Sequence, residues 1–187
     1  MYTRNKLTLT LAISMLTALL TLGTPVAKAA AAAPSDPQIV GIVMTANQVD
    51  IDYGKIALAK AKDKAVREFA QRMVTDHSVV QKSVIELAAK LGVTAEDSPT
   101  RSGLASGGVD VKAKLNSLHG KAFEKFYIDN EVSYHQAVND AVGQVLIPSA
   151  QNAELKSALQ GAQPLFLKHG EHARMVQASF NAAHPGL

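Results

Sequence analysis

The sequence predicts an all-α fold, an antiparallel bundle of four helices. Three observations lead to this prediction. Apolar residues recur with helical spacing in four long segments, almost no segment alternates like a strand, and one glycine-rich polar stretch divides the chain into two pairs of segments. Four such helices bury their apolar faces most simply against one another, as two hairpins joined by one longer connection.

The first pair of helices is marked by clear start and stop signals. The first predicted helix spans about residues 40–58. Asp63 marks either a break in the helical pattern or the cap of the second helix. This helix runs over residues 65–91 and ends at Gly92, a residue suited to the left-handed conformation that closes many helices. Serine, proline and glycine then dominate residues 98–108, so we expect a flexible polar loop there.

The second pair resumes the helical pattern after this loop. The third predicted helix covers residues 111–145 and ends near Pro148. The fourth begins at about Ser149 and continues to Phe180.

The amino-terminal segment has the layout of a secretory signal peptide. Arg4 and Lys6 precede an apolar run over residues 7–22, and the small-residue stretch Ala27–Ala30 follows. The run is short for a membrane span, and no second long apolar run follows it. We therefore expect cleavage near Ala29, location in the periplasm or secretion, and no stable membrane span after cleavage.

The predicted layout has four parts. These are a signal peptide (residues 1–29), a linker (30–36), a single helical domain (37–183) and a short tail (184–187).

The charge of the mature domain argues against polyanionic partners. The chain has 19 lysines and arginines and 16 acids. Three of the basic residues lie in the predicted leader, which contains no acid, so the mature domain has a net charge near zero. Such a domain has no overall electrostatic attraction to nucleic acid or anionic lipid. We expect no nucleic-acid partner, and a protein or small ligand instead.

Three histidines lie at inward positions of different predicted helices. His77 interrupts the apolar stripe of the second helix, His135 lies at the edge of the third, and His169 lies within the fourth. Imidazole nitrogen is a good ligand for zinc, copper, nickel or ferrous iron, so the three form a candidate transition-metal site. The alternative is that each histidine is a buried, hydrogen-bonded group that fixes helix register.

Two further residues are candidate ligands. Asp76 is the neighbour of His77, and His172 follows His169 by one helical turn in a His-x-x-His pair. A di-iron carboxylate site is not expected, because no glutamate has a histidine three positions later. No other catalytic motif is present, so we predict neither a catalytic residue nor an organic cofactor site.

Four stretches of the chain resemble the DUF4142 family of exported bacterial proteins. The resemblance covers about residues 37–182, and it is carried by the stretches 54–58, 64–77 (ending Met73-Val74-Thr75-Asp76-His77), 123–136 and 164–169. It implies a ferritin-like helical bundle, a signal peptide and the recurrent placement of His77, His135 and His169. It implies no activity. The chain departs from the pattern at Glu131-Val132, where the family usually has a Met-Val pair.

The sequence therefore supports a non-catalytic binding or stress-related protein, exported from the cytoplasm. The alternative is a transition-metal-binding bundle that uses the inward histidines. An enzymatic interpretation requires an open coordination position and an acid or base such as Glu131 beside it.

Overall fold

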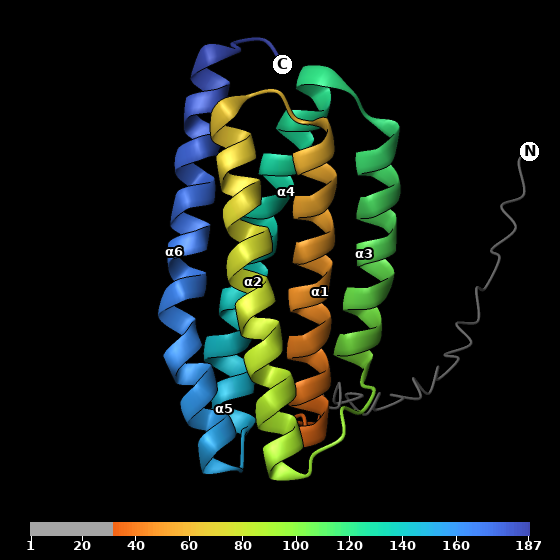
Figure 1. Ribbon diagram of the computed structural model, residues 1–187, viewed down its shortest axis with the longest axis vertical. Coiled ribbons are helices and arrows are strands. Elements are labelled where there is room, and N and C mark those ends of the chain that lie inside the picture. The colour runs from red at the N-terminus through yellow and green to blue at the C-terminus, as the bar shows by residue number, and fades with distance from the viewer. Residues whose placement is uncertain (1–31) are drawn as a thin grey trace, which may run out of the picture. The chain divides into compact units, whose positions relative to one another are not determined.

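The structure, a computed structural model, describes residues 32–187 (Figure 1). The predicted signal peptide and the first residues of the predicted linker lie outside this range. All regular elements of the described residues are helical: α1 (Asp36–Lys60), α2 (Lys64–Leu91), α3 (Pro99–Ser117), α4 (Gly120–Ala141), the π-helical turn η1 (Val142–Leu146), α5 (Ile147–Ser149) and α6 (Ala153–Ala183). The predicted all-α class is thus confirmed.

Five long helices run up and down along one axis (Figure 1). α1 and α2 form an antiparallel hairpin, α3 carries the chain back along α1, α4 then runs in the direction of α2, and α6 returns. α1 packs most extensively on α2 and α3, and α4 packs on α6, while α1–α4 and α2–α6 contacts close the interior. One side chain from each of α1, α2, α4 and α6 can therefore reach the same interior point.

The predicted loop over residues 98–108 is wrong, because this stretch is the first half of α3. The Ser98 hydroxyl accepts the backbone N–H of Arg101 (3.1 Å), and Pro99 occupies the first turn, where its missing N–H costs nothing. The predicted third helix is accordingly two helices, because Leu118 and His119 are extended and end α3 before α4 begins. Residues 32–187 therefore form five long helices where the sequence predicted four.

Gly108 explains why a glycine-containing segment forms a helix here. A Cβ atom at this position would lie 2.8 Å from Val49 Cγ2 on α1, so glycine allows the two helices to approach closely. A Cβ atom on the neighbouring Gly107 would have no heavy atom of another part of the domain within 4 Å. Tertiary packing against α1 compensates for the low helix propensity of these glycines.

This difference predicts opposite effects for two adjacent substitutions in α3. Gly107→Ala should raise the free energy of unfolding by about 0.5–1 kcal/mol through helix propensity alone. Gly108→Ala gains the same propensity but overpacks the contact with Val49, which costs about 1–3 kcal/mol, so it should be the less stable variant. Urea unfolding of both variants measures the difference, and equal stabilities would contradict close packing of α3 on α1.

Two predicted helix ends are confirmed. The Asp63 carboxylate accepts the N–H groups of Ala65 and Val66 (3.0 and 3.1 Å) and caps α2. Gly92 ends α2 in the left-handed conformation, with φ +64°.

The interior consists of two apolar clusters with a polar layer between them. Along α1, one cluster contains Ile39, Val40, Ile42 and Val43, and the other contains Val49, Tyr53 and Ala57. On α6, Phe166 belongs to the first and Ala173 to the second. Between them lie the buried polar side chains that we call the polar layer: Asn47, Asp50, His77, Glu131, His135 and His169.

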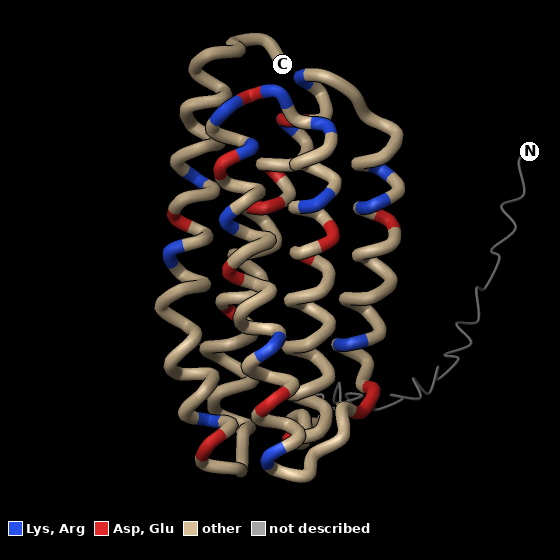
Figure 2. The backbone as a smooth tube through the Cα atoms, viewed as in Figure 1, with Lys and Arg blue, Asp and Glu red and all other residues tan. Residues whose placement is uncertain are grey.

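Basic and acidic residues are interspersed along the helices (Figure 2). As predicted, no helix within residues 32–187 combines the length and the apolar character that a membrane span requires.

Candidate metal centre

The polar layer brings together side chains from α1, α2, α4 and α6 in the middle of the domain. All six are at most 4% exposed to solvent. Buried polar groups are costly unless hydrogen bonds or charges compensate them, so the partners of each ring nitrogen are informative.

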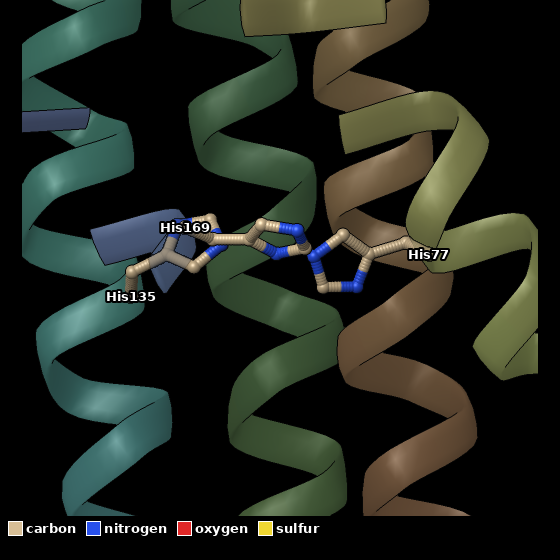
Figure 3. A group of neighbouring side chains, drawn as sticks. All are labelled: His77, His135 and His169. Carbon is tan, nitrogen blue, oxygen red and sulfur yellow. The ribbon is translucent and has the colours of Figure 1, made fainter. Parts of the chain in front are cut away.

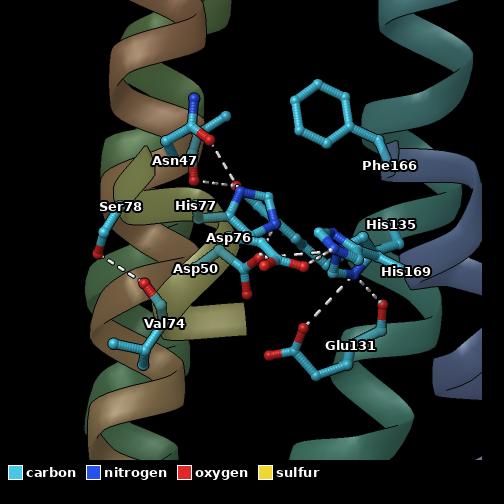
Figure 4. Close-up of polar contacts among 12 residues, drawn as sticks. Asn47, Asp50, Val74, Asp76, His77, Ser78, Glu131, His135, Phe166 and His169 are labelled. Atoms are coloured by element: carbon cyan, nitrogen blue, oxygen red, sulfur yellow. Dashed lines mark hydrogen bonds and ion pairs between the residues drawn. The ribbon is translucent and has the colours of Figure 1, made fainter. Parts of the chain in front are cut away.

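His77 on α2 is oriented by Asn47 on α1 (Figure 4). The Asn47 amide nitrogen donates to the Val43 carbonyl (2.8 Å), which turns its oxygen toward His77. That oxygen lies 2.8 Å from His77 Nδ1 and can only accept, so Nδ1 carries a proton. The other nitrogen, Nε2, faces Asp50 and lies 2.7 Å from its Oδ2.

His135 on α4 is oriented by the backbone of its own helix. Its Nδ1 lies 3.0 Å from the Glu131 carbonyl oxygen, one turn earlier, and donates to it. In the neutral ring Nε2 is then unprotonated. This atom is buried, forms no hydrogen bond within residues 32–187, and lies 3.6 Å from Asp50 Oδ2.

His169 on α6 is oriented by Asp76 on α2. Its Nε2 lies 2.9 Å from Asp76 Oδ2, so Nε2 is the protonated nitrogen in this carboxylate–histidine pair. Nδ1 is buried and has no hydrogen-bond partner among the residues that the structure describes. All three rings are therefore held through one nitrogen, and each presents the other to the interior.

The three rings point toward one another from three helices (Figure 3). One ring nitrogen from each of His77, His135 and His169 lies within 4.8 Å of the others. Aromatic packing also fixes the rings: Phe166 stacks on His77 with centroids 5.6 Å apart, and Phe69 meets the His135 ring edge-on at 6.4 Å. The sequence placed these histidines inward, and the structure shows that they converge.

Burial keeps two of the imidazoles neutral. It lowers the pKa of His135, although the nearby Asp50 charge opposes the effect. Burial also lowers the pKa of His169 to about 4, although its hydrogen bond to the Asp76 carboxylate opposes the effect. Both rings therefore have a free lone pair at neutral pH.

Two buried carboxyl groups complete the layer. Asp50, Glu131 and His135 form a second group whose ligand atoms lie within 4.8 Å of one another. Apart from the histidine rings, no N–H group of the described residues donates to either carboxyl. The resulting cage of three imidazoles and two carboxyl groups can surround a cation.

The two carboxyl groups differ in ionisation. Burial alone would raise the pKa of Asp50, but the positive charge and hydrogen bond of His77 lower it to about 2, so Asp50 is a carboxylate. Burial raises the pKa of Glu131 well above its usual range, and the Asp50 charge raises it further. Of these two carboxyl groups, only Asp50 therefore contributes a negative charge to the site.

Two residues proposed from the sequence occupy other places. Asp76 does not belong to either group of ligand atoms. Its carboxylate instead contacts Nε2 of His169, and its side chain is 29% exposed. His172 is partly exposed and packs against Phe69, with centroids 5.2 Å apart. Asp76 thus has an orienting position, and His172 lies outside the polar layer.

Sequence reasoning omitted Asp50 and Glu131 from the candidate ligands. Signals for both were present, because Asp50 follows the inward Asn47 by one turn of α1 and Glu131 precedes His135 by one turn of α4. Carboxylates next to apolar stripes are usually solvent-facing, which hides this signal.

Comparison with known proteins identifies a family for this chain. Residues 21–176 match a family described as "Domain of unknown function (DUF4142)". Neither a search of curated proteins nor a search of solved structures finds a match. The family match covers most of the sequence and includes all six residues of the polar layer. The chain is therefore a member of the DUF4142 family, as its sequence motifs predicted.

Proposed function

We propose that this protein binds one transition-metal ion in the polar layer, through His77, His135 and His169 with Asp50 as the anionic ligand. The observation that carries the proposal is the orientation of the rings. Each has one nitrogen held by a partner, as metal-binding histidines do, and one ring nitrogen of each lies within 4.8 Å of those of the other two.

The contact between His77 and Asp50 supports a cation at this point. An unprotonated Nε2 at 2.7 Å from a carboxylate oxygen would be repelled by it. A proton on Nε2 relieves the repulsion in the metal-free protein, and a metal ion bound to both atoms would do so in the loaded one. Metal binding is then expected to release this proton.

The donor set favours a divalent transition metal. Three imidazoles with a carboxylate suit zinc, ferrous iron, cobalt, nickel or copper, whereas calcium and magnesium prefer oxygen ligands alone. The chain contains no cysteine, so thiolate chemistry has no part in the site. The site also lacks the two Glu-x-x-His pairs of di-iron bundles, which favours a single ion.

The course of the helices supports a ferritin-like arrangement. α1 and α2 form one hairpin, α4 and α6 form the other, and the connection between them runs the length of the domain. A single long crossover of this kind is the ferritin-like topology. We propose that α3 is this crossover in helical form, and that the protein is exported, as its amino-terminal segment predicts.

The site is best suited to binding, in agreement with a non-catalytic role. Its ligands are buried and come from four packed helices, so it is preorganised to retain an ion. The competing function is a bundle in which the same histidines only hold the helices together.

Metal titration of paired histidine variants tests the proposal. Protein purified without a histidine tag and stripped of metal should bind one equivalent of zinc or cobalt, measured by elemental analysis and calorimetry. His169→Ala should weaken binding by more than the roughly 10–100-fold that losing an outer-sphere partner costs.

His172→Ala is the matched control, because it removes an imidazole from the same helix outside the polar layer. Its affinity should remain that of the unmodified protein. If the unmodified protein takes up no metal and His169→Ala is merely less stable, the histidines have a structural role only.

A further inference from the structure

An apolar pocket opens directly onto the polar layer. It has a volume of about 240 Å³ and lies between α1, α3 and α4. Its walls are mainly apolar, both aliphatic (Ile42, Leu104 and Val138 among them) and aromatic (Tyr134 and Phe166). Asn47, His77 and His135 also line it.

The pocket has a deep end and a mouth. His77 and His135 at the deep end are at most 4% exposed, whereas Thr100 on α3 and Ala137 on α4 are exposed. Among the residues that the structure describes, no lysine, arginine, aspartate or glutamate lines this pocket. A molecule that enters past Thr100 and Ala137 therefore meets no ammonium, guanidinium or carboxylate group of the described residues before it reaches the imidazoles.

The π-helical turn contributes to the pocket wall. Val142 and Leu146, at the two ends of η1, both line it. Such turns inside α-helices are rare and often occur at functional sites. Here the wider turn positions two apolar side chains of the pocket.

We propose that this pocket binds a small apolar molecule that carries one metal-binding oxygen, with its apolar body in the pocket and its oxygen on the ion held by the histidines. The proposal rests on the metal site proposed above. A dry apolar cavity of about 150 Å³ accommodates benzene, so the present volume suits a substituted benzene or a short acyl chain. Orientation comes from the metal, because the walls offer no charged group.

Cobalt-loaded protein provides the test, because the visible absorption of the ion changes when its ligands change. Benzoate is the probe, and it should alter the spectrum with saturation. Acetate has the same head group without the ring and should bind about tenfold or more weakly. Toluene has the ring without the oxygen, so it should leave the spectrum unchanged but weaken benzoate binding by competition.

Two alanine variants on α4 make the test specific to the pocket. Ala137→Phe places a ring at the mouth and should weaken benzoate binding about tenfold or more, with cobalt affinity unchanged. Ala122→Phe is the control, because Ala122 is also exposed on α4 but does not line the pocket.

The outcomes separate the two proposals. If the protein binds cobalt but benzoate binds no better than acetate, or equally well in both variants, the pocket proposal is overturned and the metal site stands. If no cobalt binds to a folded protein, both proposals are overturned.

Discussion

Replacing Asp50 with asparagine is expected to reduce transition-metal affinity by more than about a hundredfold, the largest effect of any conservative change in this protein. Asp50 supplies the buried carboxylate oxygen that lies close to two of the histidines, 2.7 Å from His77 Nε2 and 3.6 Å from His135 Nε2. Asparagine keeps the shape and the oxygen but removes the charge, and a buried cation interacts strongly with a buried charge.

The metal-free protein should also lose stability. Asp50 and His77 form a buried ion pair, with side chains 0% and 6% exposed. Removing one partner of such a pair costs about 3–5 kcal/mol. Chemical unfolding of the metal-free variant measures this loss, and calorimetry of the folded variant measures metal affinity separately.

Asp52→Asn is the matched control. Asp52 lies two residues further along α1, with its side chain 30% exposed, and pairs with Lys112 of α3 (2.9 Å). It carries the same charge close to the site in sequence but faces away from the polar layer. Metal affinity should be unchanged, and unfolding should change by about 1 kcal/mol or less. Equal losses of metal affinity in both variants would refute a direct role for Asp50.

The histidine cluster shows which parts of the site the sequence could predict. His77, His135 and His169 interrupt apolar stripes, and helical periodicity alone places such residues in the interior. Whether inward residues of different helices meet depends on the axial register of the helices relative to one another. A shift of one helix by one turn along its axis moves its side chains by about 5.4 Å. The structure, but not the periodicity of the sequence, gives this axial register.

Asp76 shows that adjacency in the sequence is a poor predictor of a shared site. It was a candidate ligand because it is adjacent to His77, yet consecutive residues of a helix point about 100° apart. It therefore contacts His169 of α6 instead of the common point that His77 faces. A pair three or four residues apart, such as Glu131 and His135, is the better signal for a shared site.

The α3 segment shows where local sequence reasoning fails. Its glycines indicate a loop, and only the packing of Gly108 against Val49 makes a glycine favourable in that helix. The cap formed by Ser98 and Pro99 was the one local signal for a helix, and it is weaker than three glycines within six residues.

A second large effect is expected for Glu131→Gln, which should stabilise the metal-free protein at alkaline pH. Burial first, and then the Asp50 charge, raise the pKa of Glu131 well above its ordinary value of 4.5. Above pH 4.5 the unfolded chain releases this proton while the folded protein keeps it, so stability falls with rising pH by up to about 1.4 kcal/mol per unit. Glutamine is neutral in both states, which removes this loss.

The comparison of the two proteins makes the effect attributable to Glu131, because the ion pair between His77 and Asp50 is present in both. The lowered pKa values of His135 and His169 affect stability only below the usual histidine range, since stability is lost as pH falls from about 6.5 toward the folded value. Between pH 7.5 and 9 both rings are neutral in either state. Urea unfolding across this window, with chelator present, should show a falling stability for the unmodified protein and a flatter profile for Glu131→Gln.

Glu124→Gln is the control with the opposite sign. Glu124 is also a buried glutamate of α4, 2% exposed, but its carboxylate accepts the N–H groups of Lys62 and Asp63 (2.6 and 2.7 Å). Burial alone would raise its pKa, but these hydrogen bonds and Lys121 lower it. Its stabilising effect is therefore present at neutral pH and lost as pH falls through the lowered value. Glu124→Gln should destabilise the protein at pH 7.5 by about 1–2 kcal/mol. If the two variants shift stability in the same direction, Glu131 is ionised in the folded protein and the site holds two negative charges instead of one.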